Sequence, residues 1–203
     1  MRIRTILAAA AAPAALAAVL LGTTAASAAT NPNANPGNGA VVITSQAQAD
    51  SLGGATVKNV DVPAGVTRPD GSPIWLSWMH ITGNLTVEGN VYLTGDTIDG
   101  NVIVSGPGSF LGLSNFASHI GHNLNVQGSS GIYTGGPGTT SFGNWTQYNG
   151  PSQVDGNLNF IGNSGSLYSG YAMHVNGNFT YTGNTGPVLD RGGLTVSGQT
   201  VTG

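Results

Sequence analysis

One short phrase recurs along this chain and restricts its fold more than any other feature of the sequence. It reads apolar, any, Gly, Asn, apolar, any, apolar, any, Gly. The full copies are Ile81–Gly89, Ile98–Gly106, Ile120–Gly128, Val154–Gly162 and Val175–Gly183, and degenerate copies lie at 57–62 and 192–198. Repetition of one phrase in this way is the sequence signature of a repeat architecture.

The Asn of the phrase gives the length of each repeat. It stands at positions 84, 101, 123, 157 and 178, and Gly193 holds its place in the last copy, so the steps are 17, 22, 34, 21 and 15 residues. Such steps are too long for a hairpin repeat and suit one coil of a solenoid. Within each copy the apolar residues alternate with the period of a β-strand, and Gly at both sides ends the strand.

The first full coil also indicates where its corners lie. Glycines at 83, 89, 95, 100 and 106 are spaced 6, 6, 5 and 6 residues apart. Three short sides of about six residues predict a triangular coil, with Gly supplying the unusual backbone angles of the corners. Asn tolerates such angles better than most residues. Asn side chains at one place in successive coils are expected to stack into a hydrogen-bonded ladder.

The alternating apolar residues of the copies predict the core. They form two inward columns: Leu85, Val102, Leu124, Leu158 and Phe179, and Val87, Val104, Val126, Phe160 and Tyr181. We therefore predict an all-β fold, a right-handed parallel β-helix (β-solenoid) of about six to eight short coils. A sandwich of β-hairpins is the alternative, but it does not explain why the Gly-Asn phrase returns about once per coil.

With these copies, residues 55–203 resemble secreted bacterial parallel β-helix proteins with Gly-Asn-rich coils. The copies are also similar, more distantly, to the repeats of bactofilins, which are polymer-forming bacterial scaffold proteins. The resemblance implies a solenoid, but so short a motif says little about function. Bactofilins lack a secretory signal and keep a steadier coil length, so a filament is only weakly implied.

The N-terminus has the order of a secretory signal peptide. Arg2 and Arg4 form a basic start, residues 6–21 are almost wholly apolar, and Ala26-Ser27-Ala28 fits the small-x-small rule for cleavage. A retained membrane anchor is the alternative. We expect a secreted protein, extracellular or at the cell surface, whose parts are the signal peptide 1–28, a flexible segment 29–44 and the solenoid domain 45–203 with its cap and irregular loops.

Both ends of a solenoid expose strand edges, so caps are expected. Residues 45–52 are predicted to form a short helix over the first coil, ended by Gly53 and Gly54. Residues 194–201 remain strand-like and show no clear cap, which leaves self-association through the solenoid ends open.

Charge narrows the classes of partner. After cleavage the chain keeps three basic residues, Lys58, Arg68 and Arg191, against eight carboxylates, a net charge of −5. Three scattered cations do not form the basic surface that nucleic acid or an anionic membrane requires. The sequence after the signal has no apolar run of membrane-spanning length, and the chain has no cysteine, so its stability has to come from regular packing.

Catalytic and metal-binding motifs are sparse. Asp96 and Asp99 are the only acidic pair within three residues, and Gly-x-Ser-x-Gly is absent. His80, His119 and His174 share a column, but His80 and His119 belong to coils about 10 Å apart, too far for one Zn²⁺. We assign no catalytic residue, metal or cofactor. An enzyme would be a polysaccharide lyase or glycoside hydrolase, with Asp96, Asp99 or Asp155 meeting a base in a groove.

Two irregular stretches carry aromatic residues that are candidates for ligand binding. The candidates are Trp145, Tyr148, Tyr133, Trp75 and Trp78. Exposed aromatic rings on a rigid β-surface stack on the apolar faces of sugar rings. The competing interpretation makes Trp145 a core residue of a degenerate coil, because Gly143-Asn144 mimics the phrase.

We therefore expect an exported, non-catalytic structural or cell-surface protein. The alternative is a carbohydrate-binding module that uses the aromatic loops, with a polysaccharide or the cell wall as partner. Ice binding is disfavoured because Thr82, Thr86 and Thr94 do not recur at matching places in the later copies.

Overall fold

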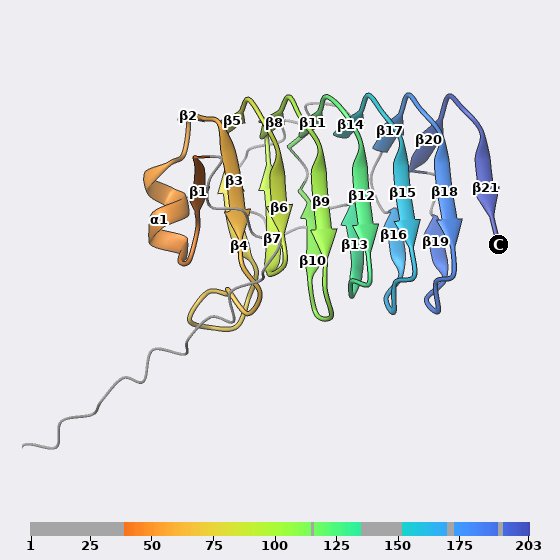
Figure 1. Cartoon of the computed structure of the whole chain (residues 1–203), viewed down its shortest axis with the longest axis horizontal. Coiled ribbons are helices and arrows are strands. Elements are labelled where there is room, and N and C mark those ends of the chain that lie inside the picture. The colour runs from red at the N-terminus through yellow and green to blue at the C-terminus, as the bar shows by residue number, and fades with distance from the viewer. Residues whose placement is uncertain (1–38, 115, 135–151, 170–172, 191–192) are drawn as a thin grey trace, which may run out of the picture.

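The strands of the protein wind into a rod of stacked coils (Figure 1). The computed structural model describes residues 39–203 except 115, 135–151, 170–172 and 191–192. Each strand pairs in parallel with the equivalent strand of the next coil, as β6 does with β9 and β9 with β12. The predicted parallel β-solenoid is confirmed.

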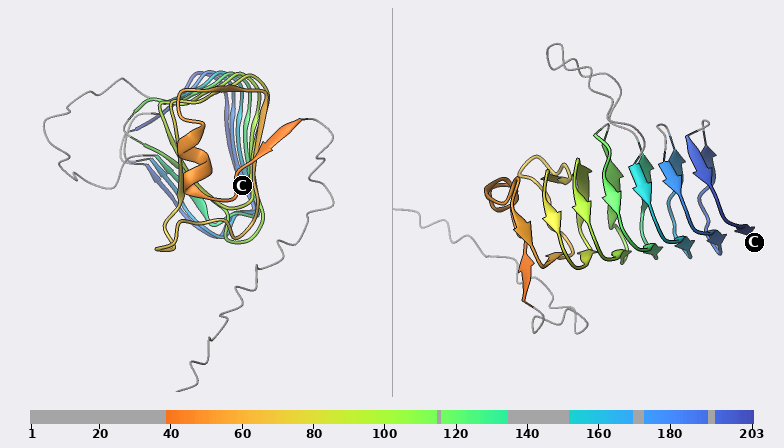
Figure 2. Two further views of the ribbon diagram at one scale, coloured as in Figure 1. Left: turned by 90° about the vertical axis from the view of Figure 1, so that its left-hand side faces the viewer. Right: turned by 90° about the horizontal axis from the view of Figure 1, so that it is seen from above.

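Three sheets form the walls of the rod, which confirms the three-sided coil (Figure 2). Wall A contains β1 (Ala40–Val42), β3 (Asn59–Val62), β6 (Leu85–Val87), β9 (Val102–Ser105), β12 (Leu124–Gln127), β15 (Leu158–Ile161), β18 (Phe179–Thr182) and β21 (Thr200–Thr202). Wall B contains β2 (Thr56–Val57), β5 (His80–Ile81), β8 (Thr97–Ile98), β11 (His119–Ile120), β14 (Ser152–Val154), β17 (Met173–Val175) and β20 (Leu194–Val196). Wall C contains β4 (Ile74–Ser77), β7 (Asn90–Thr94), β10 (Phe110–Leu113), β13 (Gly131–Thr134), β16 (Leu167–Ser169) and β19 (Val188–Asp190).

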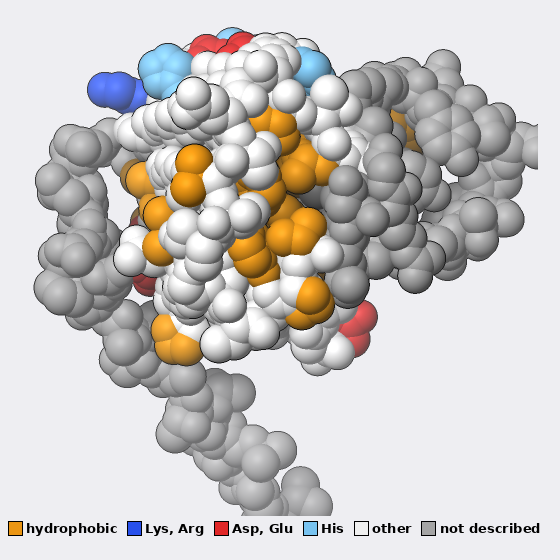
Figure 3. Space-filling model, turned by 90° about the vertical axis from the view of Figure 1, so that its right-hand side faces the viewer, with side chains coloured by type: hydrophobic (Ala, Val, Ile, Leu, Met, Phe, Trp, Pro, Cys, Tyr) orange, Lys and Arg blue, Asp and Glu red, His pale blue; other side chains and the backbone are white. Residues whose placement is uncertain are grey.

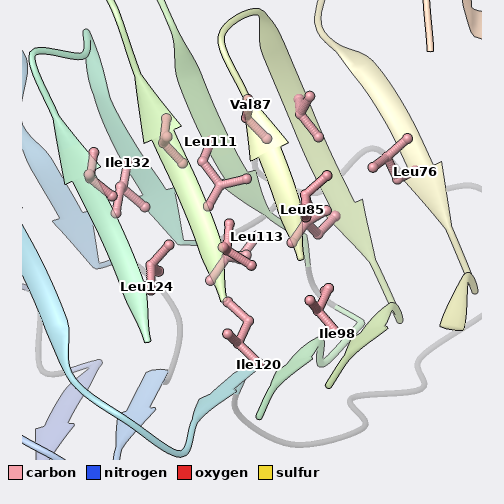
Figure 4. Packing of buried hydrophobic residues seen from close by; sticks show 14 of the residues in the cluster. Leu76, Leu85, Val87, Ile98, Leu111, Leu113, Ile120, Leu124 and Ile132 are labelled. Carbon is pink, nitrogen blue, oxygen red and sulfur yellow. The ribbon is translucent and has the colours of Figure 1, made fainter. Parts of the chain in front are cut away.

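The core is a column of apolar side chains that all three walls enclose. Leu85 and Val87 of wall A, Ile98 of wall B and Leu111 of wall C are completely buried and face one another (Figure 4). The predicted inward columns are buried as far as Phe179, and Tyr181 is partly buried. Full burial of a side chain of this size contributes about 1.5–3 kcal/mol, so regular packing stabilises a chain that has no disulfide.

The predicted Asn ladder runs the length of the rod, and it is built mainly from side chain to backbone. Each Asn Oδ1 accepts the backbone N–H at the same position of the following coil, over distances of 2.8–3.2 Å. The members are Asn59, Asn84, Asn101, Asn123, Asn157, Asn178 and, at the end, Gln199. The degenerate first copy at 57–62 is therefore a true coil.

The predicted last copy is wrong. Gly193 does not hold the ladder position, because Leu194–Val196 forms β20 on wall B and pairs with β17. The ladder position belongs to Gln199, 21 residues after Asn178, and β21 follows it on wall A. An apolar strand of wall B was mistaken for the equivalent strand of wall A.

The N-terminal end of the rod is closed by α1 (Gln46–Ser51), as predicted (Figures 1 and 2). The Ser45 side chain caps this helix by accepting the Gln48 N–H at 3.3 Å, and Ala49 is buried against the first coil. Strand β1 precedes the helix and pairs with β3. None of the described helices is long and apolar enough to cross a membrane.

Candidate functional site

The five predicted aromatic candidates fall in different parts of the structure. Trp75 lies in β4, and Trp78 follows the end of that strand. Tyr133 lies in β13, but its side chain is outside the described part of the chain, as are Trp145 and Tyr148 entirely. The structure therefore describes the surroundings of Trp75 and Trp78 alone among the five.

Trp75 belongs to a row of rings on the outer face of wall C, which we call the aromatic strip: Trp75, Tyr92 and Phe110. Ile74 and Leu76, which flank Trp75 in β4, are completely buried. Because side chains alternate along a strand, Trp75 points outward. The ring centroids of Trp75 and Tyr92 are 5.3 Å apart, and those of Tyr92 and Phe110 are 5.6 Å apart. Three successive coils each contribute one ring.

A glycine makes room for the middle ring of the strip. Gly112 is the Cα partner of Tyr92 in the next coil. A Cβ at Gly112 would overlap the Tyr92 ring, so the ring lies across the backbone of β10. In the register of wall C, Trp75, Tyr92, Gly112, Tyr133 and Tyr168 are successive Cα partners.

Trp78 forms a second aromatic group at the corner between walls C and B. Its side chain is 53% exposed, and its ring lies 5.4 Å from that of Phe116, centroid to centroid. The residue has a left-handed φ of 59°, which is unusual for a bulky residue. A Cβ at Gly95 would meet the Trp78 ring at 2.5 Å, so this glycine provides the surface on which the ring rests.

A buried carboxyl group fixes this corner from within. Asp96 Oδ1 accepts the Met79 N–H at 2.8 Å, and its Oδ2 accepts the Thr94 N–H at 2.7 Å. The side chain is completely buried, and desolvation raises its pKa from 3.8 to about 6, although the two N–H groups oppose that shift. Asp96 therefore does not lie in an open groove, and its evident role is to hold the backbone on either side of Trp78.

The other acidic candidates lie on the outer face of wall B and pair with histidines. His80 Nε2 lies 2.9 Å from Asp99 Oδ2, and His119 Nε2 lies 2.8 Å from Asp155 Oδ2. Each pair joins one coil to the next. Hydrogen bonds hold the pKa of Asp155 below its usual value, and the one from Gln153 contributes more than the one from His119.

The predicted histidine column is present, since His119 pairs in register with Thr97 and Gln153. The contact that the column did not predict is diagonal: His80 and His119 each meet an aspartate two positions beyond their register partner in the next coil. Within the described residues, no three His, Asp or Glu side chains gather closely enough to hold a metal ion.

The C-terminal end of the rod differs from the capped N-terminal end. Hydrophobic side chains are visible across this end (Figure 3). Val188, Leu194 and Val196 pack against the core but stay partly exposed, and Val201 is 50% exposed. Strands β19, β20 and β21 are the last of their three sheets.

These features define a parallel β-solenoid protein with a helix at its first coil and an aromatic outer wall. Comparison with protein-family models, with curated proteins and with solved structures gives no match to this chain.

Proposed function

We propose that this protein is an exported, non-catalytic structural protein of the cell surface, and that its last described coil (β19 to β21) pairs with the last coil of a second copy. The difference between the two ends carries the proposal. Within the described chain β19, β20 and β21 each have a neighbour on one side only, as β1, β2 and β4 have at the other end, but there α1 packs against β4 and buries Ala49 on the first coil. An uncovered sheet edge is a template for pairing with another chain.

The backbone of β21 supports such pairing. Gln199 and Gly203 direct their backbone groups toward β18, in hydrogen bonds of 2.8 and 3.1 Å. Because backbone groups alternate in direction along a strand, those of Thr200 and Thr202 are turned toward the open end. A second copy brings the same groups from its own edge, so each copy satisfies the donors and acceptors of the other.

The side chains at this end favour a like partner. The last three strands carry one charged residue, Asp190, and partly exposed apolar residues surround the end of the core. Two such ends that meet about a two-fold axis bury apolar surface without opposing large charges. Because a two-fold contact uses the same end of both copies, association by this route stops at a dimer.

The oligomeric state of the secreted chain tests this proposal. We expect a dimer at tens of micromolar concentration by size-exclusion chromatography with light scattering. Thr200→Pro removes a backbone donor at the open edge and is expected to give a monomer with unchanged circular dichroism. Thr200→Val keeps the donor and is the matched control, which should remain a dimer. A monomeric parent protein, or a dimeric Thr200→Pro variant, would overturn the proposal.

Export is supported by the order of basic, apolar and small residues at the N-terminus. The low charge and the resemblance to secreted bacterial β-helix proteins agree with it. Expression of the full chain in a secreting bacterial host should release a protein whose intact mass equals residues 29–203. A chain that keeps residues 1–28 in the membrane fraction would contradict export and favour a retained anchor.

A further inference from the structure

We propose that the outer face of wall C, between the aromatic strip and the Trp78–Phe116 corner, is a binding surface for an uncharged polysaccharide. The inference does not depend on the self-association proposed above, because it concerns a long wall of the rod and not its end. It also differs from the aromatic loops expected from the sequence, since it places the site on strands.

The arrangement of side chains on this face is the first observation. The aromatic strip has one ring within β4, one within β7 and one at the start of β10, and Trp78 and Phe116 lie beyond the ends of β4 and β10. Between the two aromatic groups lies a row of hydroxyl residues: Ser77, its register partner Thr94, and Ser114, which follows the partner of Leu93. The face therefore alternates from aromatic to hydroxyl to aromatic.

Polar atoms without partners are the second, independent observation. Thr94 is only 6% exposed, and its Oγ1 has no hydrogen-bond partner among the described residues. Asn90 Oδ1, on the other side of Tyr92 in the same strand, is also buried without a described partner. A buried polar atom that lacks a partner has a free-energy cost of about 1–3 kcal/mol. Both atoms are closed to solvent, so a ligand with hydroxyl groups supplies the missing hydrogen bonds once neighbouring side chains move aside.

Charge decides which ligand fits. Strands β4, β7 and β10 contain no acidic or basic residue, so the face offers nothing to neutralise an anionic or cationic polymer. A neutral sugar chain combines apolar ring faces, which stack on aromatic rings, with hydroxyl groups that bond to Thr, Ser and Asn.

The repeat of the wall explains why the ligand is a polymer and not a single sugar. The centroids of neighbouring rings of the strip lie 5.3 and 5.6 Å apart. This step is close to the length of one sugar residue in an extended chain, so successive coils are placed to meet successive sugars. Trp78, with half of its side chain exposed, offers the largest free ring surface.

Affinity electrophoresis of the secreted chain tests the proposal. The probes are the neutral polymers hydroxyethyl cellulose, xylan and laminarin, with polygalacturonate as the anionic comparison. We expect at least one neutral polymer to retard the protein and polygalacturonate to leave its mobility unchanged. Failure of all three neutral polymers to retard a folded protein, or retardation by polygalacturonate alone, would overturn the inference.

Variants then locate the site. Trp78→Gly removes the exposed ring and fits the left-handed backbone, so the fold is retained, and we expect the dissociation constant to rise at least tenfold. Trp78→Tyr should restore part of the affinity. Ile161→Ala, which removes an exposed apolar side chain from wall A, is the matched control and should bind as the parent does. Unchanged affinity in Trp78→Gly, or binding lost only in Trp145→Ala, would contradict a site on wall C.

Discussion

Glycine has two separate functions in this fold, and its place in the phrase decides which applies. The glycine that precedes the ladder Asn does not have a left-handed φ, contrary to the expectation that every corner needs one. At Gly156 a Cβ would lie 2.7 Å from the His122 carbonyl oxygen of the preceding coil. In the copies after the first, the glycine that ends the phrase is different: Gly128, for example, has a φ of 64° and open space around it.

These two functions predict opposite responses to asparagine. Gly156→Ala and Gly156→Asn should both lower the free energy of unfolding by about 1–3 kcal/mol, because any side chain is too large. Gly128→Ala should cost about 1–2 kcal/mol through backbone strain, and Gly128→Asn less, since Asn adopts the left-handed region more readily. Urea denaturation of the four variants measures these differences. If Gly156→Asn were clearly more stable than Gly156→Ala, close contact between coils could not be the reason for glycine at this position.

Asp96 gives the fold a dependence on pH. Its pKa is higher in the folded protein, about 6, than the 3.8 of an unperturbed carboxyl. The folded state therefore holds the proton more tightly, and the resulting stabilisation, complete below the unfolded pKa, is lost as pH rises through about 6. A rise of about two pKa units corresponds to about 3 kcal/mol.

The measurement compares the parent with Asp96→Asn, which does not titrate at this site. Between pH 4 and pH 7 the free energy of unfolding of the parent should fall relative to that of the variant, by up to about 3 kcal/mol. Taking the difference cancels every contribution that the two proteins share. A difference that is constant over this pH range would show that Asp96 does not titrate within it.

At the scale of elements, the Asn ladder couples each coil to the next. Asn123→Ala leaves the Asn157 N–H without its acceptor, so we expect the free energy of unfolding to fall by about 1–3 kcal/mol. Asn125→Ala is the control two residues away: it removes a partly exposed acceptor on the outside of wall A, bonded to Asn159, and should cost less than about 1 kcal/mol. Chemical denaturation of both variants is the test, and equal losses would contradict a special role for the ladder.

The elements that could be predicted from the sequence are those that the phrase marks. The alternation of apolar residues fixed the core columns of wall A, and the repeated Asn indicated the ladder. The last coil was misplaced because Leu194–Val196, with Gly198 after it, imitates the phrase. In sequence, this strand of wall B looks like a strand of wall A, and only its pairing with neighbouring strands tells the two apart.

The aromatic strip could not be found in this way. Tyr92 and Phe110 lie outside the nine-residue copies and come from different stretches of the chain. Parallel pairing of β4, β7 and β10 brings them beside Trp75. A search for aromatic residues at outward positions of consecutive wall C strands would have indicated Trp75 and Tyr92, but not Phe110, which lies two residues from their column.

At the scale of the whole molecule, the cap at one end sets the proposed limit to assembly. Removal of α1 therefore predicts a change in the kind of assembly. A secreted chain that begins at Ala55 lacks both β1 and α1, so β3 becomes a sheet edge, as β2 and β4 already are, and β4 loses the helix that packs against it. An open N-terminal end then meets the open C-terminal end of another copy, and a head-to-tail contact of this kind continues without closure.

We expect this shortened chain, checked for β-structure by circular dichroism, to form filaments whose length grows with protein concentration. Electron microscopy and light scattering measure them. Thr200→Pro in the shortened chain should suppress the filaments, because it blocks one of the two edges in every contact. Filaments that persist in that variant would place the contact elsewhere, and a folded shortened chain that stays dimeric would show that α1 does not limit assembly.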